Sequence, residues 1–304
     1  MQVHSDVVIV GAGVAGMTSA IYLKRAGIDS IVIEKSAPGG QILKAFLVEN
    51  YPGFVKISGK DLSDNMFEQM KKLDIEYRKD EVVSLNINGD EKEICLGSGD
   101  KIICKAVILA VGRHPKKLEI PNLSSFVGNG LSYCATCDGR LFKNRDVLVI
   151  GGSNSALEEA VYLSNVCKSV TIVHRRNEFR AEKAWQDEVK KISNINIEYN
   201  AKLKELIKEE DVLSTAIIKC NDGSEKEIKV DGCFSSIGYE PDTDIFGNVI
   251  KLDDEGYIDT DVFGKTNIEG IFAAGDTVKK GIYQLITAMN DAVVVADSVR
   301  EYLK

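Results

Sequence analysis

A glycine-centred unit that occurs twice constrains the fold of this chain more than any other feature. The first copy runs from a β-branched segment through the glycine turn 11–16 and an amphipathic stretch to a second apolar segment that ends at Glu34. The second copy has its turn at 151–156 and ends at His174. In both copies the last residue lies 23 positions after the first glycine. The order strand, turn, helix, strand predicts two Rossmann-like, three-layer α/β domains, each built on a parallel sheet.

Chain length and two glycine–proline crossings predict how the two domains are combined. Because a domain usually has about 100–200 residues, a chain of 304 residues is expected to form two. Buried strands predicted at 106–111 and 233–237 are each followed by glycine and proline, which marks a chain leaving a domain. We therefore expect a discontinuous first domain, residues 1–114 plus 244–304, with the second, residues 115–243, inserted into it.

The first glycine turn has the spacing of a dinucleotide-binding fingerprint. The pattern alone is weak, but here it follows a predicted strand and opens a predicted helix, which is the context that gives it meaning. Gly11 permits the tight turn, Gly13 allows a pyrophosphate to approach closely, and Gly16 lets helix and strand pack together. Glu34, at the end of the second strand, is placed to accept hydrogen bonds from an adenosine ribose. This unit therefore predicts dinucleotide binding rather than a purely structural turn.

The second glycine turn predicts a different nucleotide. His174 takes the position of Glu34 and is followed by Arg175, Arg176 and Arg180. A cluster of cations suits the ribose 2′-phosphate of NADP, although a solvated basic loop is the alternative interpretation. Ser153 replaces the second glycine of the pattern, and its Cβ would crowd a pyrophosphate unless the loop shifts. NADPH is the expected donor, with weaker nicotinamide binding or another electron donor left open.

Cys134 and Cys137 are the only closely spaced pair among seven cysteines. A C-x-x-C pair is typical of half a zinc site or of a redox dithiol. Zinc needs two more ligands, and the sequence has neither a second C-x-x-C nor a His-x-x-x-His. We therefore predict a redox-active dithiol and no metal site. Asp138, next to the pair, is placed to exchange a proton with a thiolate if burial raises its pKa, or alternatively to cap a helix.

Composition and charge argue against other classes of protein. A net charge of −8 argues against a nucleic-acid partner, because phosphate binding relies on a clustered surplus of Lys and Arg. The apolar segment 7–17 lacks a basic flank and is interrupted by glycines, so we interpret it as a strand and turn rather than a signal peptide. No apolar run approaches the ~20 residues of a membrane-spanning helix. We expect a cytoplasmic protein that binds neither nucleic acid nor membrane, with the other five cysteines buried or half-buried in strands and helices.

Taken together, the motifs give the chain a resemblance to a known family. It resembles, over essentially its whole length, the low-molecular-weight thioredoxin reductases of the pyridine-nucleotide disulfide oxidoreductase class. The motifs that carry the resemblance are GAGVAG at 11–16, GGQ at 39–41, VENYPG at 48–53, CATCDG at 134–139, HRR at 174–176 with Arg180, and FAAGD at 272–276.

The resemblance implies FAD on the first glycine unit and NADPH on the second. It places Glu34 on the adenosine ribose, Asp276 on the ribityl-phosphate portion, and Gly40, Gln41 and Asn50 near the isoalloxazine ring. The FAD residues that it implies are Gly11, Gly13, Val14, Ala15, Gly16, Glu34, Gly40, Gln41, Asn50, Val83, Gly275, Asp276 and Gln284. The NADPH residues that it implies are Gly152, Ser153, Asn154, Ser155, His174, Arg175, Arg176 and Arg180.

The same resemblance implies a role for each residue of the dithiol. Cys137 would be the thiol next to the flavin, Cys134 the thiol that attacks the disulfide of thioredoxin, and Asp138 the proton donor. The chain would then be a homodimeric disulfide reductase that passes electrons from NADPH through FAD and the dithiol to thioredoxin. One domain would rotate against the other about the crossings 112–115 and 238–241, so that the dithiol alternates between flavin and thioredoxin.

Three departures from the family pattern leave alternatives open. Ser153 replaces a glycine, Asn154 replaces an acidic neighbour, and Tyr283-Gln284-Leu285 stands where the family has Arg-Gln-Ala. The last change lies by the flavin in the family, where it would alter the flavin's potential or exposure. The alternatives are a disulfide reductase that takes electrons from ferredoxin or another donor, and a flavin-binding redox sensor without turnover.

Overall fold

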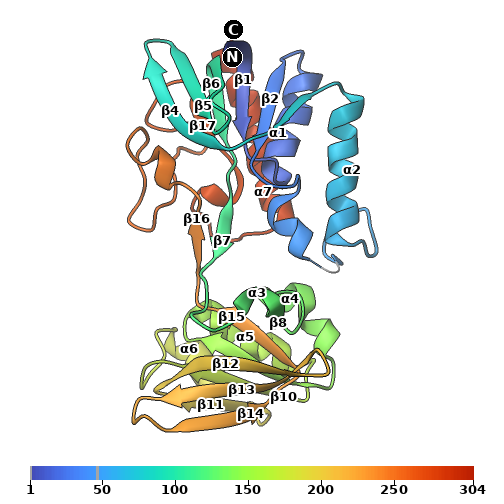
Figure 1. Cartoon of the computed structure of the whole chain (residues 1–304), viewed down its shortest axis with the longest axis vertical. Helices are drawn as coiled ribbons and strands as arrows, with labels where there is room; N and C mark the ends of the chain where they lie inside the picture. The colour runs from blue at the N-terminus through green and yellow to red at the C-terminus, as the bar shows by residue number, and fades with distance from the viewer. Residues whose placement is uncertain (1, 46–47) are drawn as a thin grey trace. The chain divides into compact units, whose positions relative to one another are not determined.

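The computed structural model describes residues 2–45 and 48–304, which form two compact units. Met1–His114 and Glu240–Lys304 make up the first unit, and Pro115–Tyr239 makes up the second. Each unit has a sheet with helices packed beside it (Figure 1). Two α/β units are what the repeated glycine motif predicts.

The first unit is built on a seven-stranded mixed sheet. Its elements are β1 (Gln2–Val10), α1 (Val14–Arg25), β2 (Ser30–Glu34), the 3₁₀ helix η1 (Gly40–Lys44), α2 (Gly59–Lys72), β3 (Glu76–Lys79), β4 (Val82–Asn88), β5 (Glu91–Leu96), β6 (Lys101–Leu109), η3 (Asp244–Phe246), β17 (Ile271–Ala273), η4 (Gly275–Thr277) and α7 (Leu285–Tyr302). The strands follow the order β3-β2-β1-β6-β5-β4, with β17 also on β6. β3, β2, β1, β6 and β17 pair in parallel, whereas β5 pairs antiparallel with both β6 and β4. The glycine turn and the helix after it connect β1 to its parallel neighbour β2.

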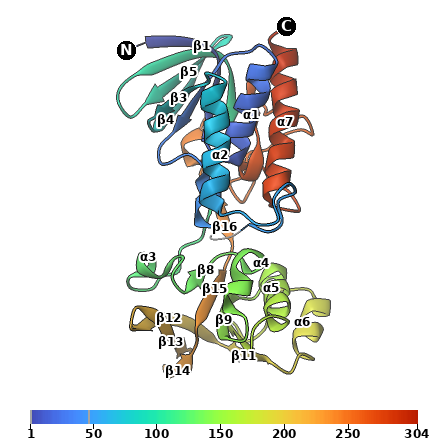
Figure 2. The same cartoon turned by 90° about the vertical axis from the view of Figure 1, so that its right-hand side faces the viewer.

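Side chains alternate across β1 and separate the core of this unit into two layers. Val7 and Ile9 pack against helices α1, α2 and α7, which lie on one face of the sheet (Figure 2). Val8 and Val10 point to the other face, where they join a cluster that includes Phe246. Because these residues of β1 are buried on both faces of the sheet, packing fixes the place of the C-terminal end of the strand. The glycine turn follows directly from that end.

The second unit has a five-stranded parallel sheet and a three-stranded antiparallel sheet. Its elements are α3 (Leu123–Phe126), β8 (Leu131–Ser132), α4 (Ala135–Asp138), η2 (Gly139–Phe142), β9 (Asp146–Gly151), α5 (Asn154–Ser164), β10 (Ser169–His174), α6 (Lys183–Val189), β11 (Ile195–Tyr199), β12 (Ala201–Glu209), β13 (Val212–Cys220), β14 (Glu225–Lys229) and β15 (Gly232–Ser236). The parallel sheet has the order β11-β10-β9-β15-β8.

The core of the second unit again lies on both faces of its parallel sheet. Val147 and Val149 of β9 pack with residues of α5 and α6. Leu148 and Ile150 pack on the opposite face with the antiparallel sheet, for example with Leu203 and other residues of β12 and β13. Helices, parallel sheet and antiparallel sheet therefore form three layers, and the expected α/β fold class is confirmed.

The chain crosses between the units twice, and the two crossings pair with each other as β7 (Arg113–Pro115) and β16 (Tyr239–Pro241). The second unit ends at Tyr239, whereas the sequence predicted an end at 243. Thr243 is completely buried, and its hydroxyl donates to the carbonyl of Gly256, so the residues after Tyr239 pack with the first unit. The strand predicted at 106–111 begins earlier, at Lys101, and ends at Leu109.

Three further features of the described residues concern membrane-spanning helices, metal-binding clusters and free cysteines. Within 2–45 and 48–304, no helix is long and apolar enough to cross a membrane. The same residues contain no group of three or more His, Cys, Asp or Glu side chains arranged to hold a metal ion. The five cysteines outside the C-x-x-C motif are unpaired, three of them buried (Cys104, Cys167 and Cys233) and two half-buried (Cys95 and Cys220).

Candidate active site

Three glycines of the first turn are required for three different reasons. Gly11 has φ = +102°, and a Cβ there would lie 2.4 Å from the carbonyl oxygen of Ala110. A Cβ at Gly16 would lie 1.9 Å from the carbonyl oxygen of Gly11, so close packing of α1 excludes it. Gly13 has an ordinary φ of −72°, and no protein atom lies within 4 Å of the position of a Cβ. Nothing within the protein requires a glycine at 13, whereas close approach of a pyrophosphate does.

The start of α1 is suited to bind a phosphate. No side chain caps this helix, although Ser58 caps α2 by accepting a hydrogen bond from the amide of Asp61. The first helical residues, Val14 and Ala15, are buried. Backbone N–H groups that no side chain caps, at the positive end of a helix dipole, favour an anionic ligand.

Two backbone amides orient the side chain of Glu34, the predicted ribose acceptor. Its carboxylate accepts from the amides of Ala12 at 2.9 Å and Ser36 at 2.8 Å. Each carboxylate oxygen can accept a further bond, as a ribose hydroxyl would provide. The carbonyl of Glu34 accepts from the amide of Asp80 at 3.1 Å, which brings the start of β4 to this edge. Val83 lies on β4 with a largely exposed side chain.

The GGQ loop and Asn50 form hydrogen bonds with other segments of the first unit. The amide of Gly39 donates to the carbonyl of Ala12 at 2.7 Å, and a Cβ at Gly40 would lie 3.3 Å from the Cα of Gly13. Gln41 Nε2 donates to the carbonyl of Arg113 at 2.7 Å. Asn50 Nδ2 donates to Gln284 Oε1 at 3.1 Å. The structure therefore brings together segments that lie up to 234 positions apart in the sequence.

Asp276 follows a turn that packs against the start of α1. Gly275 has φ = +79°, and a Cβ there would lie 2.7 Å from the Cβ of Ala15. The Oδ1 atom of Asp276 is buried and has no hydrogen-bond partner. Burial raises the pKa of this carboxyl, while the positive charges of Arg113 and Lys280 act in the opposite direction. A buried acceptor without a donor is costly, and a hydroxyl of a bound ligand would satisfy it.

Sequence reasoning missed Arg113 as part of this edge. Its guanidinium carbon lies 3.4 Å from the centroid of the Tyr283 ring, and its Nε lies 3.6 Å from Asp276 Oδ2. Desolvation raises the pKa of Tyr283 to about 12, so its hydroxyl stays protonated. The only sequence signal was the position of Arg113 directly after Gly112, at the end of a buried strand.

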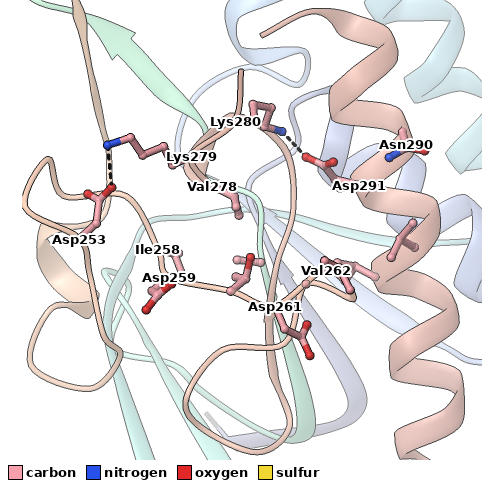
Figure 3. Close-up of a pocket in the computed structure, with 15 residues that line it drawn as sticks. Asp253, Ile258, Asp259, Asp261, Val262, Val278, Lys279, Lys280, Asn290 and Asp291 are labelled. Atoms are coloured by element: carbon pink, nitrogen blue, oxygen red, sulfur yellow. Dashed lines mark hydrogen bonds and ion pairs between the residues drawn. The ribbon is translucent and has the colours of Figure 1, made fainter. Parts of the chain in front are cut away.

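Lys280 and Asp291 support the Asp276 turn and were also missed. They line a cavity of about 360 Å³ beside α7, where Lys280 pairs with Asp291 (Figure 3). Asp291 Oδ2 also accepts from the amide of Gly275 at 3.2 Å. Lys279 pairs with Asp253 at 3.5 Å on the other side of the loop. These contacts anchor the turn that carries Asp276 to α7 and to the loop at 253.

His174, at the end of β10, is a packing residue beside the second glycine turn. Only 6% of His174 is exposed, and a Cβ at Gly152 would lie 2.2 Å from its Nδ1. Its ring also packs on Phe179, with centroids 5.4 Å apart. Burial lowers the pKa of His174, which keeps the ring neutral at pH 7. The imidazole thus supports the turn from inside, and its Nε2 is buried without a partner.

Residues 153–155 form the start of α5. Ser153 is the N-cap residue in an extended conformation, and its hydroxyl does not cap the helix. Asn154 makes two hydrogen bonds with Glu182, donating from Nδ2 at 3.0 Å and accepting the backbone amide at 2.7 Å. Ser155 is exposed. The start of α5, like that of α1, therefore carries no side-chain cap, and Asn154 ties it to the segment after β10.

The structure brings the basic cluster to the second glycine turn. The amide of Arg180 donates to the carbonyl of Gly152 at 2.8 Å. The side chains of Arg175, Arg176 and Arg180 are exposed, and none of them forms an ion pair with the residues that the structure describes. Three cations beside a helix N-terminus are suited to bind a phosphate group.

Cys134 and Cys137 form a disulfide, as the spacing of the pair allows, with Cα atoms 5.3 Å apart. Cys134 is the N-cap residue of α4, and the amide of Asp138 donates to its carbonyl at 3.1 Å. The amide of Cys134 donates to the hydroxyl oxygen of Ser132 at 3.1 Å. The dithiol segment is therefore one short helical turn whose N-cap residue lies two positions after the end of β8.

Asp138 has the environment of a proton donor. Its Oδ2 accepts from the hydroxyl of Ser132 at 2.6 Å, and its Oδ1 is buried without a partner. Burial raises the pKa of Asp138, and the Ser132 bond partly offsets that shift. Its side chain caps no helix, so of the two roles considered for Asp138 the structure favours the acid.

The profile of the pyridine nucleotide-disulphide oxidoreductase family matches residues 5–292. The chain belongs to this family. Two similar oxidoreductases are the thioredoxin reductases of Listeria monocytogenes and Bacillus subtilis, each 40% identical over 300 residues, which are 98% of this chain and 94% and 95% of theirs. The solved structure of the thioredoxin reductase of Streptococcus pyogenes is similar to this chain with a TM-score of 0.90 at 36% sequence identity. The match covers 99% of this chain and 98% of the Streptococcus chain. The expected resemblance is confirmed.

The residues of this oxidoreductase fit the two cofactors of its family. In the first unit, the open space at Gly13, the uncapped α1 and the unpaired Asp276 oxygen fit a flavin dinucleotide with an adenosine ribose at Glu34. In the second, the uncapped α5 and three unpaired arginines fit a nucleotide with an additional phosphate.

Proposed function

We propose that this oxidoreductase is a thioredoxin-disulfide reductase that uses NADPH and FAD. The observation that carries the proposal is the Cys134–Cys137 disulfide with the part-buried Asp138 directly after it, in a chain with two dinucleotide-type turns. The full-length similarity to thioredoxin reductases supports thioredoxin as the substrate. The two alternatives, a different electron donor and a sensor without turnover, are not favoured, because the arginines that suit NADPH are exposed and unpaired.

We assign FAD to the first unit and NADPH to the second. Glu34, Gln41, Asn50 and Asp276 would hold the flavin nucleotide, and Arg175, Arg176 and Arg180 the 2′-phosphate. When bound, FAD passes the two electrons of NADPH to the disulfide. The chain's residues must orient both groups, and the Tyr283–Arg113 stack would fix one side of the flavin site.

The two cysteines and Asp138 then exchange the disulfide with the partner. Two electrons and one proton convert the Cys134–Cys137 disulfide to one thiol and one thiolate. The Cys134 thiolate attacks the disulfide of thioredoxin and forms a mixed disulfide, and one sulfur of thioredoxin leaves as a thiolate. Asp138 donates the proton that this leaving thiolate takes up. The Cys137 thiol gives its proton to the Asp138 carboxylate left by that donation, and the Cys137 thiolate so formed attacks Cys134, which restores the enzyme disulfide and releases the second sulfur of thioredoxin as a thiolate.

The assembly and location belong to the same proposal. We expect a homodimer and rotation about the crossings at β7 and β16, which would carry the dithiol from the flavin to thioredoxin. Work in the cytoplasm fits the five unpaired cysteines, because that compartment keeps thiols reduced.

A trapping experiment separates the two sulfurs. The substrate is a thioredoxin with one remaining cysteine, activated as its mixed disulfide with thionitrobenzoate. We expect Cys137→Ser enzyme to release the chromophore and remain covalently bound to thioredoxin, and Cys134→Ser enzyme to do neither at a comparable rate. Equal trapping by Cys134→Ser would show that Cys134 is not the attacking thiol, and failure of the wild-type enzyme to reduce thioredoxin with NADPH would reject the proposed activity.

A further inference from the structure

A second carboxyl, that of Glu159 on α5, contacts the dithiol segment. It accepts a hydrogen bond from the backbone N–H of Ala135, the residue between Cys134 and Thr136. It also accepts from the hydroxyl of Ser236, the last residue of β15. One carboxyl therefore joins three elements of the second unit, α5, β15 and the first turn of α4.

The Ala135 amide is significant because of its place in α4. Ala135 is the first helical residue after the N-cap Cys134, so its N–H is one of the donors that a helix start leaves without an intrahelical partner. Glu159 occupies this donor while its own carboxylate carries a negative charge. A thiolate formed at Cys134 would therefore be close to a second negative charge.

The surroundings of Glu159 let it change charge near neutral pH. Burial raises its pKa to about 7, while the bonds from Ser236 and Ala135 act against that rise and the charge of Glu158 adds to it. The other titratable groups on the elements packed around α5 are Asp138 on α4, Asp146 on β9, His174 on β10, and Lys183, Asp187 and Glu188 on α6.

We propose that Glu159 is a positioning residue for the dithiol, which holds the first turn of α4 through Ala135 and takes up a proton when the disulfide is reduced. Two electrons and one proton convert the disulfide to one thiol and one thiolate. The thiolate charge favours protonation of the nearby carboxylate, so a second proton from solvent binds to Glu159. On reoxidation the thiolate charge disappears and Glu159 releases that proton. Glu159 thereby offsets the negative charge that reduction places at the start of α4.

This inference rests on the proposed role of the Cys134–Cys137 dithiol, but its test needs neither NADPH nor thioredoxin. FAD-loaded enzyme is reduced with dithiothreitol, desalted under anaerobic conditions, and alkylated with iodoacetamide between pH 5.5 and 9. Mass spectrometry gives the alkylation rate at Cys134. For the wild-type enzyme we expect a two-step pH profile, because the thiol and Glu159 titrate together.

Glu159→Gln keeps both hydrogen-bond partners within reach but cannot ionise. We expect it to show a single step and to react about three- to tenfold faster at pH 7, because a coupling of up to about one pKa unit is lost. Glu158→Gln is the matched control on the same helix and should follow the wild-type profile. A Glu159→Gln profile that superimposes on the wild type, or equal shifts in both variants, would overturn the proposal.

Ser236→Ala provides a second variant that does not depend on the folding of Glu159→Gln. The Ser236 hydroxyl lowers the pKa of Glu159, so removal of that hydroxyl should move the Glu159 step of the profile to higher pH. No shift, or a shift to lower pH, would also overturn the proposal. Far-ultraviolet circular dichroism and flavin absorbance confirm that each variant is folded and loaded.

Discussion

Ser132 and Asp138 are joined by a 2.6 Å hydrogen bond from the serine hydroxyl to Oδ2. The same serine oxygen accepts from the amide of Cys134 at 3.1 Å. One side chain at the end of β8 thus sets both the start of the dithiol turn and the proton affinity of the carboxyl at its end. Two opposing effects determine the pKa of Asp138, because burial raises it and Ser132 lowers it.

Replacement of Ser132 by alanine should raise the pKa of Asp138 further. A hydrogen bond of about 1 kcal/mol corresponds to about 0.7 pKa unit. If protonated Asp138 is the donor, activity falls as the pH rises through its pKa, so the alkaline limb should move to higher pH by roughly that amount. The measurement is the pH dependence of thioredoxin reduction. Ser125→Ala, an exposed hydroxyl of the same unit, is the control. A limb that stays in place or moves to lower pH would contradict the role of Asp138.

Gly13→Ala and Gly16→Ala should separate ligand binding from packing. Gly13 has an ordinary φ and open space at its Cβ position, so the apoprotein should unfold at nearly the wild-type urea concentration while FAD binds at least about tenfold more weakly. Gly16→Ala would place a Cβ 1.9 Å from a backbone oxygen, so it should destabilise the apoprotein by several kcal/mol. Equal effects of the two variants on the apoprotein would exclude the ligand role of Gly13.

Removal of Arg175 and Arg176 should change nucleotide preference. Loss of charge-assisted hydrogen bonds worth about 1.5–3 kcal/mol predicts a KM for NADPH raised by about 10- to 150-fold, with little change for NADH. Steady-state kinetics with both nucleotides measure it. Arg145→Ala is the matched control, because this arginine of the same unit is paired with Asp231 at 3.3 Å. An equal loss with NADH would indicate a structural effect.

The contact between Arg113 and Tyr283 should be measurable as a coupling energy. Tyr283→Leu removes the ring under the guanidinium, whereas Tyr283→Phe keeps it. In a double-mutant cycle with Arg113→Gln, we expect Tyr283→Leu to show about 1–2 kcal/mol of coupling and Tyr283→Phe almost none. Urea unfolding of the apoprotein gives these energies. A coupling for Tyr283→Phe as large as for Tyr283→Leu would assign the contact to the hydroxyl.

Patterns local in the chain predicted much of this molecule. The 23-residue spacing from Gly11 to Glu34 identified the βαβ units, because a turn, a helix of given length and a strand are determined by neighbouring residues. The C-x-x-C spacing predicted the disulfide for the same reason, since both sulfurs lie within one helical turn. His174 shows the limit of such inference: its position in the repeat was recognised, but its burial against Gly152 was not.

The sequence by itself therefore determined the two α/β units, the disulfide and the glycine turns. Only the tertiary structure brought Arg113 to Tyr283 and Asp276, and Glu159 to Ala135 and Ser236. These contacts join residues that different strands and helices carry. Their formation depends on strand order and helix packing, and no residue spacing along the chain encodes the burial that shifts the pKa values of Asp138 and Glu159.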